Sequence, residues 1–256
     1  MPIPLTTLSI RLLAAVAITG LGVALSACSD DVDKQAKKAE ATKTETAATT
    51  TSTQKVDTIK TAATTAEVKI PEPEGKVDLE KLLEPGALPD ISIGKDDAKV
   101  TIVEYMSMTC PHCARFHNDV FEPIKAKYVE TGKVKFILRE FPLDARATAA
   151  IMLARCSAKE QYFPMVSALF KSQGTWATAE DGRAALLQMS KLAGFTQESF
   201  EACLTNQKLL DDVNTVRDKA SKDYGVDSTP TFFINGNRYA GEMTVEEMSA
   251  IIDAAE

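Results

Sequence analysis

The chain is poor in histidine, tryptophan and positive charge. Its 256 residues include two His and one Trp, and 36 Asp and Glu outweigh 29 Lys and Arg, for a formal net charge of −7. The basic residues form no patch or stripe, so nucleic-acid binding has no electrostatic support and protein partners are expected. A zinc site is disfavoured too, because zinc usually takes four ligands and the chain has a single Cys-x-x-Cys.

The apolar run near the start of the chain is too short for an ordinary membrane span. Leu12 to Ala27, behind Arg11, covers about 16 residues against the about 20 that a spanning helix needs, and it ends in small residues as secretory signals do. We therefore expect residues 1–27 to be a signal peptide and the protein to be exported. Leu25-Ser26-Ala27-Cys28 resembles the lipobox of bacterial lipoproteins, which implies lipidation of Cys28. The alternative is an ordinary signal that contains a cysteine by chance.

The next stretch lacks the side chains that a folded core needs. From Asp30 to Glu74, Thr, Ala, Lys and Glu dominate, and large apolar residues are nearly absent. Such a segment cannot bury enough surface to offset the entropy lost on ordering. We expect residues 28–75 to be a disordered tether, with a partly helical stalk or an oligomerisation arm as the alternative. Residues 76–256 remain for one folded domain.

One motif in that domain indicates a chemistry. Cys110-Pro111-His112-Cys113 places two thiols two residues apart, where they can open and close a disulfide. The preceding run Val100 to Tyr105 is apolar and β-branched, which predicts a buried strand, and Ala114 to Lys127 carries apolar residues at helical spacing. A Cys-x-x-Cys at a strand-to-helix junction is typical of thioredoxin-like redox sites.

The order of the predicted elements favours an α/β fold. Val134 to Phe141 predicts a second strand, which completes a β-α-β unit. Helical patterns follow, then a hairpin with its turn at Asn235-Gly236-Asn237 and a final helix capped by Thr244. We therefore predict a thioredoxin fold with an inserted all-helical subdomain. The thioredoxin part would be 90–143 and 222–256, and the insertion 144–221.

These features together resemble the DsbA family of bacterial periplasmic thiol oxidoreductases. The resemblance covers about Pro89 to Glu256. It rests on the Cys110 to Cys113 motif, on Glu104 six residues before it, on the helical insertion, and on Thr229-Pro230 entering the strand that follows. It implies that Pro230 is a cis-proline and that the backbone near Thr229 pairs with an extended substrate. It also implies exported, cysteine-containing protein substrates and a DsbB-like membrane quinone reductase that reoxidises the motif; no cofactor is expected.

The position of the motif suggests a role for each residue. Cys110 would be the nucleophile, because the helix start stabilises a thiolate, and Cys113 the resolving thiol. His112 would donate a hydrogen bond or positive charge to that thiolate, unless it is an exposed loop residue. Glu104 would relay a proton to Cys113, unless it is a surface glutamate. His117 is interpreted as a residue on the face of the helix.

The chain has five cysteines, an odd number that is awkward in an oxidising compartment. Lipidation of Cys28 restores parity and leaves Cys156 and Cys203, both on apolar helix faces. The resemblance to a DsbA subgroup implies that these two form a second disulfide. Two buried free thiols are the alternative.

The sequence also permits other functions. The same fold serves disulfide reductases and isomerases, which run the electrons the other way. A lipoprotein that binds metal or partners through Cys110, Cys113 and a histidine is a third hypothesis. Localisation in the bacterial periplasm is expected, on the inner or the outer membrane.

Overall fold

The computed structural model describes residues 70–256. The predicted signal peptide, Cys28 and the tether as far as residue 69 lie outside the described residues. Within the described part of the chain, none of the helices is both long enough and apolar enough to span a bilayer.

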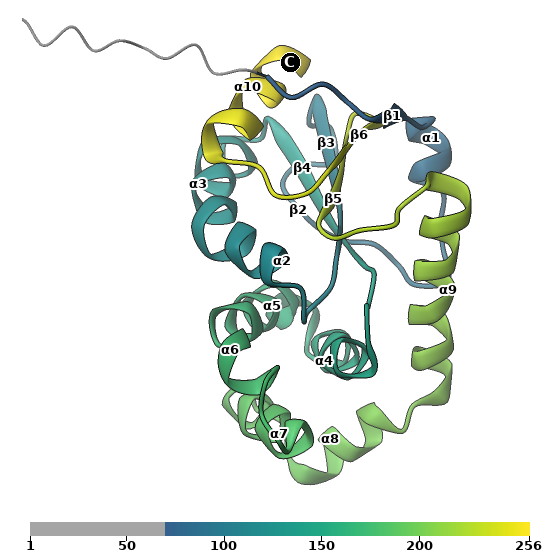
Figure 1. The fold of residues 1–256 in the computed structure, drawn as a ribbon, viewed down its shortest axis with the longest axis vertical. Helices are drawn as coiled ribbons and strands as arrows, with labels where there is room; N and C mark the ends of the chain where they lie inside the picture. The colour runs from purple at the N-terminus through teal and green to yellow at the C-terminus, as the bar shows by residue number, and fades with distance from the viewer. Residues whose placement is uncertain (1–69) are drawn as a thin grey trace, which may run out of the picture. The chain divides into compact units, whose positions relative to one another are not determined.

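A six-stranded sheet lies at the centre of the domain, with the strand order β1-β6-β5-β3-β4-β2 (Figure 1). The strands are β1 (Gly75–Lys76), β2 (Ile91–Ile93), β3 (Val100–Met106), β4 (Val134–Glu140), β5 (Thr231–Ile234) and β6 (Asn237–Ala240). Strand β3 runs parallel to β4, and every other neighbouring pair is antiparallel. All seven residues of β3 are buried, as expected for a central strand covered on both faces.

Ten α-helices accompany the sheet in the described residues. They are α1 (Leu79–Leu82), α2 (Pro111–Arg115), α3 (Phe121–Ile124), α4 (Ala145–Cys156), α5 (Tyr162–Lys171), α6 (Gln173–Trp176), α7 (Gly182–Leu192), α8 (Gln197–Leu204), α9 (Gln207–Tyr224) and α10 (Val245–Ala255). The predicted helix after the motif runs continuously from α2 onward, with π-helical turns at Phe116–Val120 and Lys125–Val129. Pro123 lies between these turns, and its missing N–H interrupts the regular helical ladder.

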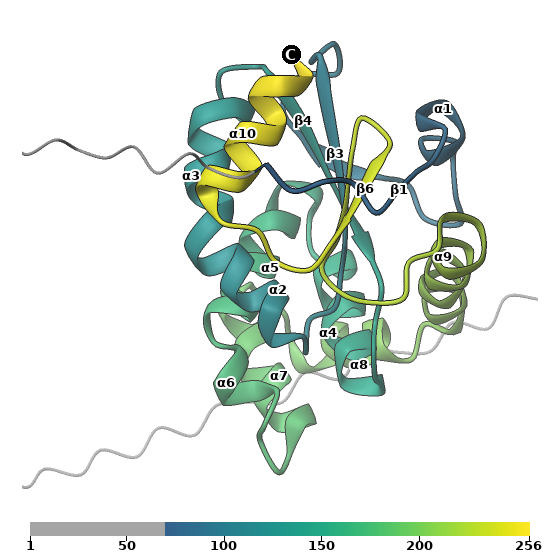
Figure 2. The ribbon, with the colours of Figure 1, turned by 45° about the horizontal axis from the view of Figure 1, so that its top comes forward.

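The alternation of β3 sends its side chains to two separate cores. Ile102 and Met106 pack with the helices that follow the motif and with α10. Val103 and Tyr105 pack on the other face with residues of α1 and α9. Figure 2 shows the sheet between α2, α3 and α10 on one side and α1 and α9 on the other. The cysteine motif therefore belongs to the first face.

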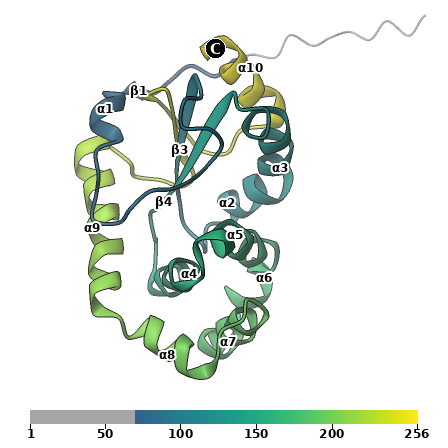
Figure 3. The same ribbon diagram turned by 180° about the vertical axis from the view of Figure 1, so that it is seen from behind.

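Helices α4 to α8 form the helical insertion beyond one end of the sheet (Figure 3). Helix α9 joins the two parts. Its Val213 packs in the core shared with the insertion, whereas Ala220 and Tyr224 pack against the sheet. With 18 residues it is about 27 Å long, enough to run along both. The expected division between residues 221 and 222 falls inside this helix.

A disulfide holds the insertion together. Cys156, the last residue of α4, is bonded to Cys203 on α8, with their Cα atoms 6.1 Å apart. Cys203 is buried among apolar side chains, as expected, but Cys156 is exposed, so the prediction of an apolar face is wrong for Cys156 because it ends its helix at the surface. The bond ties two helices whose cysteines are 47 positions apart in the chain.

The folded domain starts before residue 76. Gly75 pairs with Arg238 in β1, and the Glu74 amide donates to the Arg238 carbonyl. The predicted tether therefore ends earlier than residue 75. Backbone hydrogen bonds hold this edge strand in the sheet, and the amino-acid composition of a segment does not indicate whether its backbone makes such bonds.

The hairpin turn between β5 and β6 has the predicted chemistry. Asn235 and Gly236 both have positive φ, 47° and 84°, as a type I′ turn requires. A Cβ on Gly236 would lie 2.5 Å from the Val77 carbonyl oxygen, so the position also needs the absence of a side chain.

Candidate active site

The two motif cysteines lie where β3 leads into α2. Cys110 precedes the first helical residue with an extended backbone, and Pro111 occupies the first helical position, where no N–H is needed. The free N–H groups of the helix start therefore surround the Cys110 side chain. Both thiols are free; Cys113 is fully buried, and Cys110 is 5% exposed. The structure therefore describes the motif with two free thiols, and of the two residues only Cys110 keeps some exposed surface.

The two thiols have opposite acidities. The pKa of Cys110 falls from 9.0 to about 5, first because the Cys113 thiol donates a hydrogen bond to it. Burial opposes this shift, while the Thr229 hydroxyl and the backbone N–H groups of Cys113 and His112, which can donate to a thiolate, favour it. Burial raises the pKa of Cys113 well above its ordinary value, and the hydrogen bond to Cys110 and the charge of Glu104 add to that effect. One cysteine is therefore a thiolate at neutral pH, and the other a thiol.

The segment that leads into β5 covers Cys110. The Thr229-Pro230 peptide bond is cis, and Cys110 Sγ donates to the Thr229 carbonyl oxygen at 3.1 Å. The Thr229 hydroxyl is buried and has no hydrogen-bond partner among residues 70–256. It is therefore free to donate to a Cys110 thiolate. Thr229 thus offers an acceptor to the thiol and a donor to the thiolate.

His112 lies at the motif, but its ring engages other residues than the prediction assumed. Its Nδ1 is 2.7 Å from Nη2 of Arg115 and 3.4 Å from the Glu242 carboxylate. A guanidinium only donates, so Nδ1 accepts. Arg115 in turn donates to both Glu242 oxygens, at 2.9 and 3.0 Å. The His112 backbone N–H is among the groups that lower the pKa of Cys110.

Glu104 is fully buried behind the cysteines, and it is paired with His117. The His117 Nε2 lies 3.0 and 3.2 Å from the two carboxylate oxygens. His117 lies on a face of the helix, as interpreted, and that face is buried: the His117 side chain is as buried as that of Glu104. The sequence spacing contained a signal: His117 lies four positions after Cys113, which places both on one helix face.

The helical insertion reaches the motif through residues that sequence reasoning missed. The Gln173 amide, at the start of α6, donates to the carbonyls of Met108 and Cys110, at 2.9 Å each. Asp144, ahead of α4, accepts from the Thr109 hydroxyl at 2.6 Å. These residues come from 35 to 65 positions away in the chain, so no local pattern could identify them.

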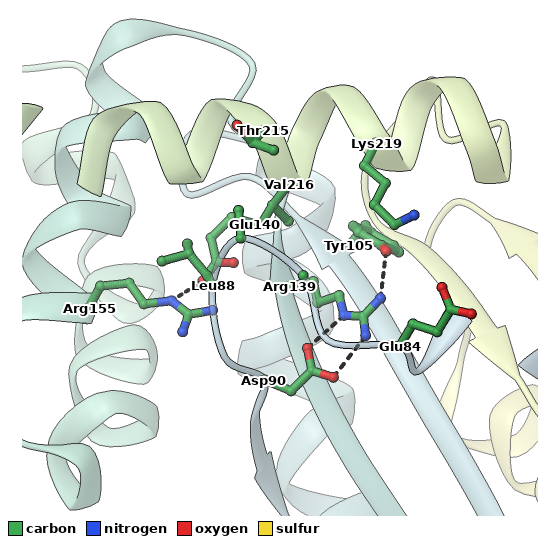
Figure 4. A pocket seen from close by; sticks show the side chains of 12 residues that line it. Glu84, Leu88, Asp90, Tyr105, Arg139, Glu140, Arg155, Thr215, Val216 and Lys219 are labelled. Carbon is green, nitrogen blue, oxygen red and sulfur yellow. Dashed lines mark hydrogen bonds and ion pairs between the residues drawn. The ribbon is translucent and has the colours of Figure 1, made fainter. Parts of the chain in front are cut away.

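A pocket on the other face of the sheet is filled with paired charges (Figure 4). Arg139 donates to both oxygens of Asp90, at 2.8 Å each, and to the Tyr105 hydroxyl at 2.9 Å, while Arg155 donates to Glu140. These contacts tie the lead-in segment and α4 to β4. The pocket lies away from the cysteines, and we assign it a structural role. Within residues 70–256, no cluster of three His, Cys, Asp or Glu side chains could hold a metal ion.

Known proteins share this sequence and fold. The profile of a family described as Thioredoxin matches residues 87–254. Among solved structures, alpha-DsbA1 of Wolbachia pipientis is 34% identical over 68% of this chain and 94% of that chain, with a TM-score of 0.63. The chain belongs to the DsbA family within the thioredoxins. The resemblance inferred from the sequence is confirmed, and so is the thioredoxin fold with its helical insertion.

Two further proteins show how far the similarity extends. A Rickettsia bellii protein, named as a protein-disulfide oxidoreductase, is 32% identical over 167 residues. The match covers 65% of this chain and 64% of that protein, so the chain spans less than two thirds of this curated relative. BdbD of Bacillus subtilis, in its oxidised form, is 19% identical with a TM-score of 0.60, over 73% and 98% of the two chains, and shows the same fold.

Proposed function

We propose that the protein is a thiol-disulfide oxidoreductase that oxidises cysteine pairs in exported proteins. A substrate thiolate attacks Cys110 of the oxidised motif, the Cys110–Cys113 bond breaks, and Cys113 leaves and takes up a proton. A second substrate thiolate then attacks the substrate sulfur of the mixed disulfide, and Cys110 leaves as a thiolate. The substrate loses two electrons and the motif gains them.

The observation that carries this direction is the contrast between the two thiols. A pKa of about 5 makes Cys110 a stable thiolate at neutral pH, and therefore a good leaving group. Stabilising the reduced motif makes the disulfide form a stronger oxidant. A reductase needs a less stable reduced form, since it must give up its electrons to substrates.

The other site residues have supporting roles in this proposal. The Thr229 hydroxyl and the His112 backbone stabilise the Cys110 thiolate, and the Thr229-Pro230 backbone receives the substrate. Glu104 handles the proton of Cys113. The substrate would be a cysteine-containing protein rather than a nucleic acid, and a DsbB-like membrane quinone reductase would reoxidise the motif.

Equilibration with glutathione tests the direction. The full chain, with its second disulfide intact, is incubated in buffers of stepped GSH and GSSG, quenched in acid and analysed by mass spectrometry. We expect the Cys110–Cys113 pair to remain reduced even in oxidising mixtures rich in GSSG, in which an ordinary structural disulfide stays oxidised. A pair more reducing than the glutathione couple would overturn the oxidase assignment and favour a reductase or isomerase. A Cys113→Ala variant should meanwhile trap mixed disulfides on Cys110 and identify the substrates.

We also propose that the domain is held at a periplasmic membrane surface through lipidated Cys28 and the tether. The support is the lipobox-like segment and the apolar run before it. Expressed in a bacterium, the wild-type protein should sediment with membranes, and a Cys28→Ser variant should move to the soluble fraction. Equal partitioning of the two proteins would remove the lipid anchor from the proposal. Density-gradient separation would assign the inner or the outer membrane.

A further inference from the structure

The buried pair of Glu104 and His117 is not explained by folding alone. Their side chains are 0% and 1% exposed, and each would need a partner at this depth. Glu104 comes from the middle of β3, and His117 from the π turn that follows α2, one turn beyond Cys113. Such π turns occur often at functional sites. Helical spacing places His117 on the same helix face as Cys113, and the charge of Glu104 acts on the Cys113 thiol.

The surroundings of His117 define its protonation. Its ring stacks on Phe170 with centroids 4.4 Å apart, and Phe121 lies 5.0 Å away. Nδ1 is buried and has no hydrogen-bond partner among the described residues. An imidazolium would leave a charged N–H unpaired there, which is costly. The unpartnered Nδ1 therefore favours the tautomer of His117 whose Nε2–H donates to the Glu104 carboxylate.

We propose that His117 is a positioning residue that holds the Glu104 carboxylate for proton exchange with Cys113. The inference rests on the proposed function and deepens it. The motif closes from a mixed disulfide between Cys110 and a partner sulfur: Cys113 gives its proton to the Glu104–His117 pair, its sulfur bonds to the Cys110 sulfur, and the bond from Cys110 to the partner breaks, so that the partner leaves as a thiolate. When a substrate thiolate opens the disulfide, Cys113 leaves and takes the same proton back. The pair stores one proton per cycle, so no proton has to cross the buried core from solvent.

The charged neighbours allow this exchange. Cys113 on α2 faces the pair, and α5 contributes Tyr162, whose pKa is raised well above its ordinary value by burial. Tyr162 therefore stays protonated, and it donates to Glu140 on β4, which Arg155 also binds. The remaining contacts of the His117 ring with α3 and α5 are aromatic, from Phe121 and Phe170. Among these groups, Cys113 is the one whose proton must move in the reaction.

Two variants of His117 separate positioning from packing. His117→Gln keeps an N–H donor for Glu104 but does not titrate, and His117→Phe keeps the ring stacking but removes the donor. Asn118→Gln, exposed on the same π turn, is the matched control. The full-length reduced proteins are mixed with a small aromatic disulfide that first forms a mixed disulfide with Cys110. Attack of Cys113 then releases the second aromatic thiol, which stopped-flow absorbance follows between pH 4 and 9.

We expect His117→Phe to slow the second release about 100-fold at pH 6, a typical contribution of a positioned proton acceptor, with the rate rising tenfold per pH unit. His117→Gln should recover part of the rate, and Asn118→Gln should match the wild type. A His117→Phe pH profile that superimposes on the wild type would overturn the proposal. The proposal would also be overturned if the pKa of Cys110, measured by alkylation, were shifted in His117→Phe by enough to explain the slower release. Failure of the wild type to release the second thiol would instead contradict the proposed function.

Discussion

Alkylation of Cys110 in the reduced protein is expected to reach half of its maximal rate near pH 5. The unperturbed pKa of a cysteine is 9.0, and the site lowers that of Cys110 to about 5. At pH 7 Cys110 would be about 99% thiolate, whereas an ordinary thiol would be about 1%. Cys113 should stay unmodified over this range, because it is buried and its pKa is raised. Short iodoacetamide pulses from pH 3.5 to 9, followed by peptide mass spectrometry, measure both residues.

The same shift makes the stability of the reduced protein depend on pH. Because folding lowers the pKa of Cys110, its ionisation stabilises the folded state; this contribution is complete above pH 9 and is lost as the pH falls through about 5. Between pH 5 and 7 the reduced protein should gain about 2 kcal/mol relative to a Cys110→Ala variant. A half-point of alkylation above pH 8, or no pH-dependent difference between the two proteins, would show that the helix start and its hydrogen bonds do not acidify this thiol.

Removal of the second disulfide is expected to lower the free energy of unfolding by about 4 kcal/mol. Cys156 and Cys203 close a loop with a sequence separation of 47, and constraining a loop of that size reduces the entropy of the unfolded chain by this amount. A Cys156→Ala/Cys203→Ala double variant compared with the oxidised wild type in urea should show a lower midpoint.

Controls distinguish the crosslink from the packing at its two ends. The wild type with this disulfide reduced should be destabilised to a similar extent, because it loses the crosslink and keeps both sulfur atoms. The pH profile of Cys110 alkylation should be the same in the double variant, since the motif is tied to other contacts. A loss below about 1 kcal/mol would mean that the unfolded chain is already constrained in this region.

The residues of the site differ in how far the sequence could predict them. The position of Cys110 at a helix start follows from the apolar strand before it and from Pro111 after it, which are local signals. Glu104 was identified through the family resemblance and is found buried. His112 was correctly located at the motif, yet its ring direction depends on Glu242, 130 positions away. Only the folded chain brings those two residues together.

His117 shows why a spacing pattern is incomplete. Helical periodicity predicts which residues share a face of the helix, but it does not predict which other segments pack against that face. The burial of His117 results from Phe170 of the insertion and Glu104 of β3, which come from opposite sides of it in the sequence. Gln173 is a similar case, since its contact with the Cys110 carbonyl requires the insertion to fold back over the motif.

The sequence by itself determined the family, the fold class, the redox motif, the hairpin turn and the capped last helix. Each of these depends on residues close together in the chain, whose backbone preferences and spacing act before any tertiary contact forms. The tertiary structure decided the acidity of Cys110, the partner of Glu104, the direction of the His112 ring and the reach of α9 across both parts. Burial and hydrogen bonding between distant segments set these properties, because a pKa or an ion pair depends on which groups surround it and how much water they exclude. The motif Cys110-Pro111-His112-Cys113 thus states the chemistry, and the surrounding fold makes its two thiols unequal.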